Sequence, residues 1–439
     1  MADQPQRVRS QINLINSLLN QGINNIVFII ACQIKEDELL RIEKIKKIFL
    51  VKQLNAKNST QLIQNKNKSL LKYFVKNTSI GQLVYMFLLS IKMFNLLKIA
   101  NKIIKNEKPN ILFVNGDRGG VSFEQSFLIA AIKNNVKSVV PYTSTISNGL
   151  SLRFADISNY SKKTFLDLLV FKFFSNITKR VKNKTILFYD ASTTLILFFF
   201  GSLSKNPWMI GNGLADYVCI DNQMSFNKYC NEMIYEGKFK IMGDIEYDTL
   251  YQISKATDKK IFHKYNIMTD KEVVIIALPQ LAEHFILGWD EHWSEIYYIM
   301  DVVEALNVNV LISLHPKMDL SKYTHLESKY KCKILDEQLK DVINHADLFI
   351  AVNSSTVLWS VILGIKTIVL DYFNVDSNFF KEFTSIEFVS DKNKLLEVAQ
   401  KILEQDIDFT HDFELMSKNE IFDGKTTQRY IKLIQEATK

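Results

Sequence analysis

The chain has 439 residues, of which 47% are hydrophobic and 23% are charged. These values exclude a disordered chain and are sufficient for two domains of ordinary size. The formal net charge of +7 is modest. No zinc-finger, helix-turn-helix or RNA-recognition signature accompanies the basic residues, so we expect no nucleic-acid partner.

The chain has four cysteines, at Cys32, Cys219, Cys230 and Cys332, without CxxC spacing. We expect them to be free thiols in a reducing compartment. The N-terminus lacks the apolar core of a signal peptide. No apolar run reaches the roughly 20 residues of a transmembrane helix, and the longest, residues 195–200, is expected to be a buried strand.

Basic residues gather in two stretches of the first half. Residues 66–108 hold nine lysines and one acid, and residues 162–184 hold seven basic residues and one acid. Aromatic and aliphatic side chains lie between these charges, a pattern that fits the surface of an anionic membrane. Ordinary solvated helix faces are the alternative. We expect a cytoplasmic protein that is peripheral to the inner face of the cell membrane.

The first half alternates between helical and strand patterns, which is typical of βαβ units and a parallel sheet. Its first element is an amphipathic helix, so either the sheet begins differently here or the sequence starts after a first strand. The basic, aromatic segment 165–181 is expected to be a helix. The other expected elements are helices 10–20, 35–46, 61–105 and 122–133, and strands 26–31, 48–51, 110–114, 138–140, 185–189, 216–220 and 238–242.

The second half repeats this alternation. Its central stretch, residues 345–372, combines a strand over 348–352, a polar turn, a helix over 357–363 that Gly364 closes, and a strand over 367–370. The other expected elements are strands 273–278, 308–314 and 333–335, and helices 293–306, 392–405 and 426–437.

Polar turns follow two strands of the second half. The sequence NSST occupies residues 353–356, and HPK occupies residues 315–317. Ligands of open α/β sheets bind outside the carboxyl ends of strands, and a helix start with unpaired N–H groups favours phosphate. A simple N-cap is the alternative for the serines. The predicted nucleotide-binding residues are His315, Pro316, Lys317, Ser354, Ser355 and Thr356.

This HP pair followed by an SST turn resembles bacterial capsule-type glycosyltransferases, among them polysialyltransferases and glycerophosphate polymerases. The same order of motifs also resembles the UDP-GlcNAc 2-epimerases, which share the GT-B architecture. The resemblance covers most of the chain by the order of its elements, through short motifs. It implies an α/β fold with two Rossmann-like, doubly wound domains that face a central cleft.

The resemblance also implies a domain boundary. The stretch GDIEYDTLY, residues 243–251, resembles the segment that crosses between GT-B domains. We therefore expect an acceptor-binding domain over residues 1–245 and a nucleotide-sugar-binding domain over residues 246–420. The C-terminal helix, within residues 421–439, is expected to pack back on the first domain.

The glycine-rich turn NGDRGG, residues 115–120, follows strand 110–114 and lets a substrate approach the backbone closely. We predict that Asp117 is the catalytic base that takes the proton of an acceptor hydroxyl, with Glu124 as the alternative. Arg118 and Gly119 are predicted to contact substrate. A turn stabilised by its own hydrogen bonds is the competing interpretation.

The GDR part of this turn resembles the epimerases, in which the corresponding Asp is catalytic. Two stretches depart from that family. Its HVEAG sequence is replaced by VPYTS at residues 140–144, and its serine-glycine turn with a glutamate-bearing helix is replaced by SST and an uncharged helix. The resemblance implies that those glutamates hold the ribose of UDP. Their absence favours a CMP-activated donor.

Histidines at strand ends are expected to act on the leaving phosphate. His284 is predicted to be catalytic, with Glu283 favouring its imidazolium form. Protonated His315 and Lys317 would neutralise the phosphate, so we expect neither a metal nor another cofactor. Asp371 is predicted to contact the donor sugar. Four other histidines are expected to be exposed: His263, His292, His325 and His411.

These observations predict an inverting, metal-independent glycosyltransferase. Its donor would be a CMP-activated acidic sugar of the sialic acid or Kdo type, and its acceptor a bacterial capsule or lipopolysaccharide glycan. One alternative is an enzyme similar to the UDP-GlcNAc 2-epimerases. Another is a non-catalytic protein that binds a nucleotide sugar within an assembly complex.

Overall fold

The computed structural model describes residues 5–30, 47–50, 78–142, 164–181, 184–230, 236–254, 260–268, 270–283, 286–315, 318–352, 354–373, 380–417 and 422–438. The expected helix over 35–46 and the start of that over 61–105 lie outside these ranges. The chain divides into two compact units, residues 1–245 with 426–439, and residues 246–425. Each unit has its own parallel sheet and its own hydrophobic cores.

The second unit is built on a six-stranded parallel sheet with the order β11-β10-β9-β12-β13-β14. Its strands are nearly continuous apolar runs, as expected for a sheet that is buried on both faces. In β9, Val274 and Ile276 enter one core, and Val273 and Ile275 enter the other. The strands are β9 Val273–Ala277, β10 Asn309–Ser313, β11 Cys332–Ile334, β12 Leu348–Ala351, β13 Lys366–Leu370 and β14 Ile386–Val389.

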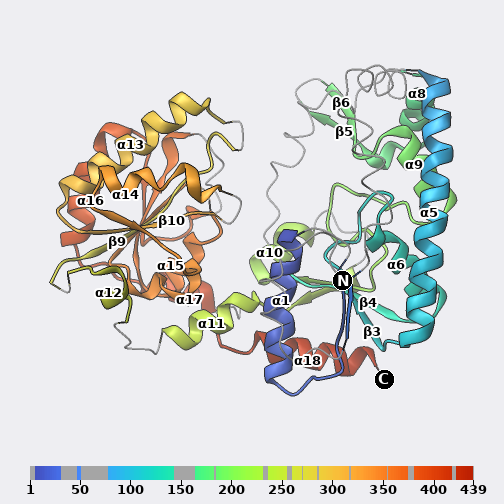
Figure 1. Ribbon diagram of the computed structural model, residues 1–439, viewed down its shortest axis with the longest axis horizontal. Coiled ribbons are helices and arrows are strands. Elements are labelled where there is room, and N and C mark those ends of the chain that lie inside the picture. The colour runs from blue at the N-terminus through green and yellow to red at the C-terminus, as the bar shows by residue number, and fades with distance from the viewer. Residues whose placement is uncertain are drawn as a thin grey trace. The chain divides into compact units, whose positions relative to one another are not determined.

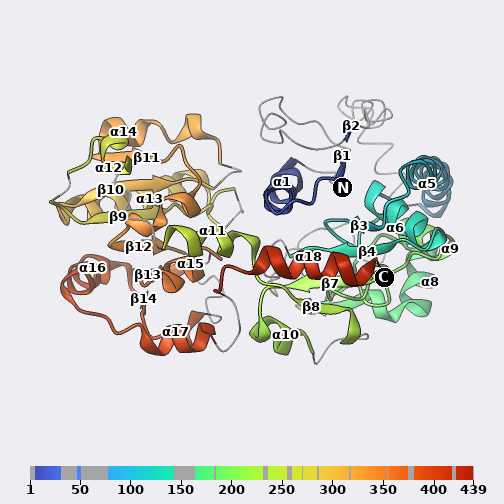
Figure 2. The same cartoon turned by 90° about the horizontal axis from the view of Figure 1, so that it is seen from below.

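Helices cover both faces of this sheet (Figures 1 and 2). One core contains side chains of α13, α14 and α16, and the other contains side chains of α11, α12, α15 and α17. Gly364 ends α15 with a φ of +69°, which glycine adopts without steric cost. The helices are α11 Ile245–Ile253, α12 Lys260–Tyr265, α13 Trp289–Ala305, α14 His325–Lys329, α15 Val357–Ile362, α16 Leu395–Glu404 and α17 Thr410–Ser417.

The first unit has a four-stranded parallel sheet with the order β3-β4-β7-β8 and a separate pair of parallel strands, β1 and β2. Its main core packs Ala100 of α5 and Phe127 of α6 against Leu112 and Val218 of the sheet. The strands are β1 Val27–Ile30, β2 Lys47–Leu50, β3 Ile111–Phe113, β4 Lys137–Val140, β7 Tyr217–Ile220 and β8 Phe239–Ile241. The helices are α1 Pro5–Asn20, α5 Ser79–Glu107, α6 Phe123–Lys133 and α10 Gln223–Cys230.

The C-terminal helix α18, Thr426–Ala437, belongs to the first unit. It lies against α1, and its buried Tyr430 and Leu433 share a core with Leu14 of that helix (Figure 1). The backbone N–H of Tyr142, which follows β4, donates to the Tyr430 hydroxyl oxygen over 3.0 Å. Hydrophobic packing and this hydrogen bond therefore fix the helix at the end of a strand.

Two segments of the first unit differ from the expectations. Residues 195–200, expected as a strand, lie mostly in helix α9, Ala191–Phe199, where Asp190 caps the start by accepting from Thr193 N–H over 2.8 Å. Helix α8, Phe165–Phe173, is shorter than expected. It is followed by the antiparallel strands β5 Thr178–Val181 and β6 Lys184–Leu187. A short apolar run does not by itself distinguish a helix from a buried strand.

Helix α5 is more apolar than was expected from the sequence. It has 29 residues, and its most apolar 18-residue window has a mean hydropathy of 1.7. By length and composition it is the one helix in the described ranges that could cross a bilayer. The sequence analysis missed it because Gln82, Ser90 and Lys92 interrupt the apolar run.

The Tyr430 hydroxyl gives a test of how α18 is held. Tyr430→Phe leaves the partly buried Tyr142 N–H without its acceptor, so we expect the free energy of unfolding to fall by about 1–3 kcal/mol. Urea denaturation measures this change. Lys432→Ala on the same helix removes a side chain that is 78% exposed and should have an effect below about 0.5 kcal/mol. Equal stability of both variants would show that the hydrogen bond does not hold the helix.

Candidate functional site

Three predicted positions of the second unit follow strands that end at one edge of the sheet. His315 follows β10, the turn 354–356 follows β12 and Asp371 follows β13. These strands are parallel, so their carboxyl ends share this edge. Because β9 lies between β10 and β12, the ends of these two strands are about 10 Å apart, twice the usual strand spacing. Ligands of open α/β sheets bind at such an edge.

Hydroxyl groups hold the turn that follows β12. Ser354 Oγ and Thr356 Oγ1 form a hydrogen bond of 2.8 Å, and Thr356 N–H donates to Ser354 Oγ. The N–H groups of Val357 and Leu358 donate to carbonyls three residues earlier, so the helix start has fewer free donors than expected. Ser355 is exposed, and its hydroxyl has no hydrogen-bond partner among the described residues. The Ser355 hydroxyl is therefore not engaged within the turn.

Several predicted residues lie outside the described ranges. They are His284 and the pair Pro316 and Lys317, so their roles in catalysis and phosphate binding stay predictions. His315 is exposed at the end of β10. Asp371 is partly exposed and begins a short 3-10 helix after β13.

A hollow of about 590 Å³ opens among residues that follow β13 and β14. Tyr372 and Phe373 line it with rings 4.3 Å apart, and Lys392 and Glu295 line it as an ion pair of 2.9 Å. Within the described ranges, the buried Tyr372 hydroxyl and Glu295 Oε2 lack hydrogen-bond partners, which a ligand could supply. No group of three or more His, Cys, Asp or Glu side chains suited to a metal occurs in the part of the chain that the structure describes.

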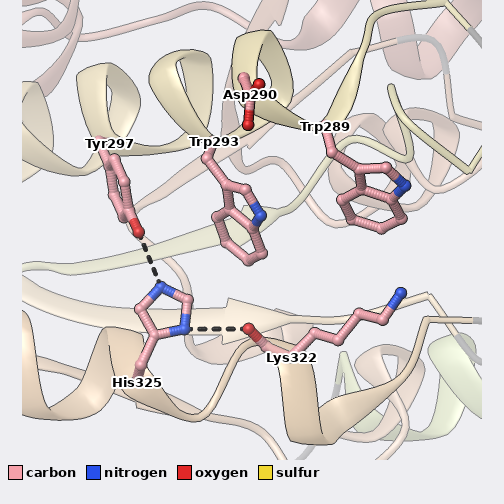
Figure 3. Close-up of a pocket in the computed structure, with 6 residues that line it drawn as sticks. All are labelled: Trp289, Asp290, Trp293, Tyr297, Lys322 and His325. Carbon is pink, nitrogen blue, oxygen red and sulfur yellow. Dashed lines mark hydrogen bonds between the residues drawn. The ribbon is translucent and has the colours of Figure 1, made fainter.

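A second hollow, of about 600 Å³, lies against helix α13 (Figure 3). Trp289, Trp293 and Tyr297 come from successive turns, with neighbouring ring centroids 6.5 and 5.9 Å apart and ring planes at 31° and 28°. Opposite them, Lys322 Nζ lies 4.1 Å from the Trp289 ring centroid, and His325 Nε2 lies 3.1 Å from the Tyr297 hydroxyl. Apolar ring faces bordered by polar groups suit a sugar, whose ring has apolar faces and polar edges.

A row of buried polar groups connects α13 with the residues that follow β9. The Tyr323 hydroxyl donates to Glu283 Oε1 over 2.7 Å, and His292 Nε2 lies 3.0 Å from the same hydroxyl. His292 is fully buried, which corrects the expectation that it is exposed, and His325 is half-buried. Burial lowers the pKa of His292 against the opposing charge of Glu283. Glu283, expected to act on His284, is thus engaged with Tyr323.

In the first unit, Asp117 lies in the turn after β3 and is 3% exposed. Gly213 packs directly on it, because a Cβ at Gly213 would overlap the carboxyl and carbonyl groups of Asp117. Lys238 Nζ donates to the Gly213 carbonyl over 2.9 Å, and Arg118 Nε lies 3.9 Å from Asp117 Oδ1. Within the described ranges, Asp117 Oδ2 has no hydrogen-bond partner. The loop before β7, residues 200–216, therefore covers the predicted base Asp117.

Burial is the main cause of the raised pKa of the Asp117 carboxyl. The charges of Arg118 and Lys238 and the N–H groups of Asp117 and Gly213 act in the opposite direction. Burial also lowers the pKa of Lys238, against the attraction of Asp117. A carboxylate whose pKa is raised is a stronger base than an exposed one, so this environment suits proton transfer.

Glu124, the alternative base, supports the same turn. It is 2% exposed, and its Oε1 accepts from the N–H of Asn115 over 3.2 Å. Gln11 of α1 donates to Asn115 Oδ1 over 2.9 Å. Arg118 donates to the carbonyl of Pro207 in the covering loop over 2.8 Å. These bonds give Glu124 and Arg118 a clear role in holding the turn, alongside the predicted roles in chemistry.

The predicted site residues did not include Gly213, Lys238 or Tyr189. The Tyr189 hydroxyl donates to the Arg118 carbonyl over 2.6 Å from 71 residues further along the chain. Such distant partners leave no local pattern, and the two glycines of the loop before β7 were the available signal. Gly119 is partly exposed beside Ser122, the N-cap of α6, and its contact with substrate stays a prediction.

No family model and no curated protein sequence matches the chain. Solved structures match it over most of its length. UDP-GlcNAc 2-epimerase from Methanocaldococcus jannaschii is 15% identical, with 97% of this chain and 95% of that chain covered and a TM-score of 0.53. S. aureus MnaA, in a structure with UDP, is 13% identical, with 98% and 93% covered and a TM-score of 0.53.

These similarities confirm the predicted fold class, GT-B with two Rossmann-like units. At this level of identity they show the fold and leave the activity open. The wall teichoic acid polymerase TagF is 16% identical, with 51% of this chain and 56% of that chain covered. Its TM-score of 0.36 is too low to support a conclusion about this chain. The similarity to polysialyltransferases that the motifs suggested stays a prediction.

The contact between Gly213 and Asp117 gives a steric test. Gly213→Ala places a methyl group against the carboxyl and should lower the free energy of unfolding by about 1–3 kcal/mol. Gly237→Ala is the matched control, because a Cβ there meets nothing within 4 Å. Chemical denaturation measures both. If the two alanine variants are equally stable, the loop does not press on Asp117.

The raised pKa of Asp117 predicts a pH-dependent stability. Between the unfolded pKa of 3.8 and the raised folded pKa, Asp117 is protonated in the folded state and ionised in the unfolded state. The free energy of unfolding therefore falls as pH rises through this interval. Asp117→Asn removes that loss. The stability of Asp117→Asn relative to wild type should therefore increase from pH 4 upward, by about 1.4 kcal/mol for each unit of raised pKa. Denaturation at a series of pH values measures this, and a constant or falling difference would contradict it.

Proposed function

We propose that the protein is an inverting glycosyltransferase that moves a sugar from a nucleotide donor to a glycan hydroxyl and requires no metal. The second unit binds the donor at the edge that carries His315, Ser355 and Asp371. The first unit binds the acceptor and supplies the base. The fold supports a nucleotide-sugar substrate, since the similar structures include an enzyme named for UDP-GlcNAc and a complex with UDP.

The observation that carries the transferase proposal is the absence of acidic side chains from α15. This helix reads VLWSVI, and Val357, Leu358, Val361 and Ile362 are buried in the core of the unit. The resemblance to the epimerases implies glutamates at this helix, which hold the ribose of UDP. Here a ribose would meet the hydroxyl turn 354–356 instead. We therefore favour a cytidine donor, such as a CMP-linked acidic sugar.

The proposed reaction is a single displacement. The acceptor oxygen forms a bond to the anomeric carbon while the bond from that carbon to the phosphate oxygen breaks. The proton of the acceptor hydroxyl passes to the Asp117 carboxylate, which the acceptor reaches once the covering loop moves away from Oδ2. His315, with the predicted partners Lys317 and His284, neutralises the charge of the departing nucleotide. Glu124 remains the alternative base.

The acceptor is proposed to be a bacterial surface glycan, of the capsule or lipopolysaccharide type, built on the cytoplasmic side of the membrane. In the second unit, the hollow at Trp289, Trp293 and Tyr297 supports a carbohydrate substrate in general, because its ring faces and polar rim match a sugar. The reacting acceptor hydroxyl is still assigned to the first unit. We propose no nucleic-acid partner for the protein.

The fold similarity favours a second candidate, an epimerase that acts on a UDP-amino sugar. The GDR turn supports it, since the resemblance places the catalytic Asp of the epimerases at Asp117. Such an enzyme would invert the configuration at C2 of the nucleotide-linked sugar and would need no acceptor. A protein that binds a nucleotide sugar without catalysis would leave the donor unchanged.

Thermal melting with CMP, CDP, UDP, GDP and ADP tests the donor site. At about 100 times its Kd, a ligand adds about 2.7 kcal/mol of stability, or roughly 5–10 °C in Tm. We expect this shift with cytidine nucleotides. Ser355→Ala should weaken it by about tenfold in Kd through the lost hydroxyl, whereas Ser328→Ala, exposed on α14, should not. A shift with UDP alone would overturn the cytidine donor.

Product analysis then separates the candidates. With donor and acceptor glycan, wild-type protein should release free nucleotide and extend the glycan in the presence of EDTA. Asp117→Asn should lose this activity by at least about 100-fold and retain the nucleotide-induced Tm shift. Epimerised donor without acceptor would establish the second candidate. Unchanged donor, despite a Tm shift, would establish a binding protein.

A further inference from the structure

The N-terminal half of helix α5 exposes a continuous apolar stripe. Its largest exposed side chains are Ile80, Phe87 and Phe94, which are 68%, 65% and 63% exposed. Leu83, Val84, Leu88 and Ile91 fill the positions between them at helical spacing. The opposite side of the helix enters the core through Met93 and Leu97. This half of α5 is therefore apolar on both sides, although one side faces out of the unit.

Helices α8 and α9, which neighbour α5, also expose apolar side chains. They pack against α5 (Figure 1) and expose Phe165, Phe173 and Phe199 by 63%, 68% and 70%. Twelve of the eighteen large apolar side chains that are exposed in the described ranges lie on these three helices. A concentration of this kind marks an interaction surface, because scattered exposed apolar residues are the usual case.

A buried polar network fixes the three helices to one another. Gln82 of α5 donates to Asp167 of α8 over 3.2 Å and accepts from the Thr164 hydroxyl over 2.7 Å. The Ser192 hydroxyl of α9 donates to the Gln82 carbonyl over 2.9 Å. All four residues are less than 9% exposed. The apolar surface is thus a built part of the unit.

Basic residues outnumber the partly exposed acids Glu107 and Asp190 near this surface. Lys92, Lys98, Lys102 and Lys105 are exposed on α5, and Lys172 is exposed on α8. Asp167, the acid of α8, is buried in the network that joins the helices. Lysines around an apolar face complement anionic lipid headgroups, and their long side chains reach the headgroups while apolar neighbours enter the acyl region.

We propose that α5, α8 and α9 form a monotopic docking surface for an anionic lipid bilayer. The exposed stripe over residues 80–94 is about 22 Å long, shorter than the roughly 30 Å of a bilayer core. A spanning α5 would break the hydrogen bonds of Gln82 and expose the core side of the helix. Pairing with the same surface of a second copy would place lysines against lysines.

Co-sedimentation of the full chain with lipid vesicles tests this proposal, which does not depend on the catalytic function. Wild-type protein should bind phosphatidylcholine vesicles that contain phosphatidylglycerol, more weakly those without it, and less at high salt. Phe87→Ser with Phe94→Ser should lower the partition coefficient by about 100-fold, roughly tenfold for each ring. Ile132→Ser, on α6 and 51% exposed, is the matched control and should change binding less than about twofold.

Three results would overturn the proposal. One is wild-type protein that stays in the supernatant with anionic vesicles. Another is a double serine variant that binds like wild type, with far-ultraviolet circular dichroism showing that both are folded. The third is bound protein that resists extraction by alkaline carbonate, as a spanning helix does. Sedimentation velocity without vesicles tests whether a second copy of the chain covers this surface instead. That would be the result if the double variant abolished a dimer and left vesicle binding unchanged.

Discussion

Burial of the second unit's sheet on both faces decides where its chemistry can lie. The strands VVIIA and LFIA, β9 and β12, carry no polar side chain, because helices cover them from either side. Hydrogen-bonding groups therefore appear where the strands end. The same constraint makes α15 apolar, since its side chains must fill the core beneath it. His315, Ser355 and Asp371 are thus brought to one edge by the packing of apolar residues in the two cores.

The first unit places its carboxyl group differently. Asp117 also follows a strand, yet Gly213 and the loop before β7 cover it. The cover excludes water, and exclusion of water raises the basicity of the carboxylate. It also separates the group from any acceptor, so access to Oδ2 requires the loop to be displaced. The contact between Gly213 and Asp117 therefore both raises the pKa of the carboxyl group and closes access to it.

Much of the fold could be predicted from the sequence, because its signals are local. The strands 348–352 and 308–314 are apolar runs between turns, and Gly364 marks the end of a helix. The misjudged features depend on distant partners. His292 is buried because Tyr323 meets it from 31 residues away. The turn 354–356 is a local exception, because the hydroxyls of Ser354 and Thr356 bond to each other. Helix α5 was misjudged because its polar residue Gln82 serves the joint with α8 rather than solvent.

The place of α18 in the first unit has a consequence for synthesis of the chain. The core that surrounds Tyr430 and Leu433 contains Leu14 and Val139, which leave the ribosome long before the helix that completes it. The intervening second unit spans residues 246–425, which take roughly 9–36 s to translate at about 5–20 residues per second. During that interval the nascent first unit presents an open apolar groove, and the second unit can fold ahead of it. The first unit, although synthesised first, can thus complete its fold after the second unit.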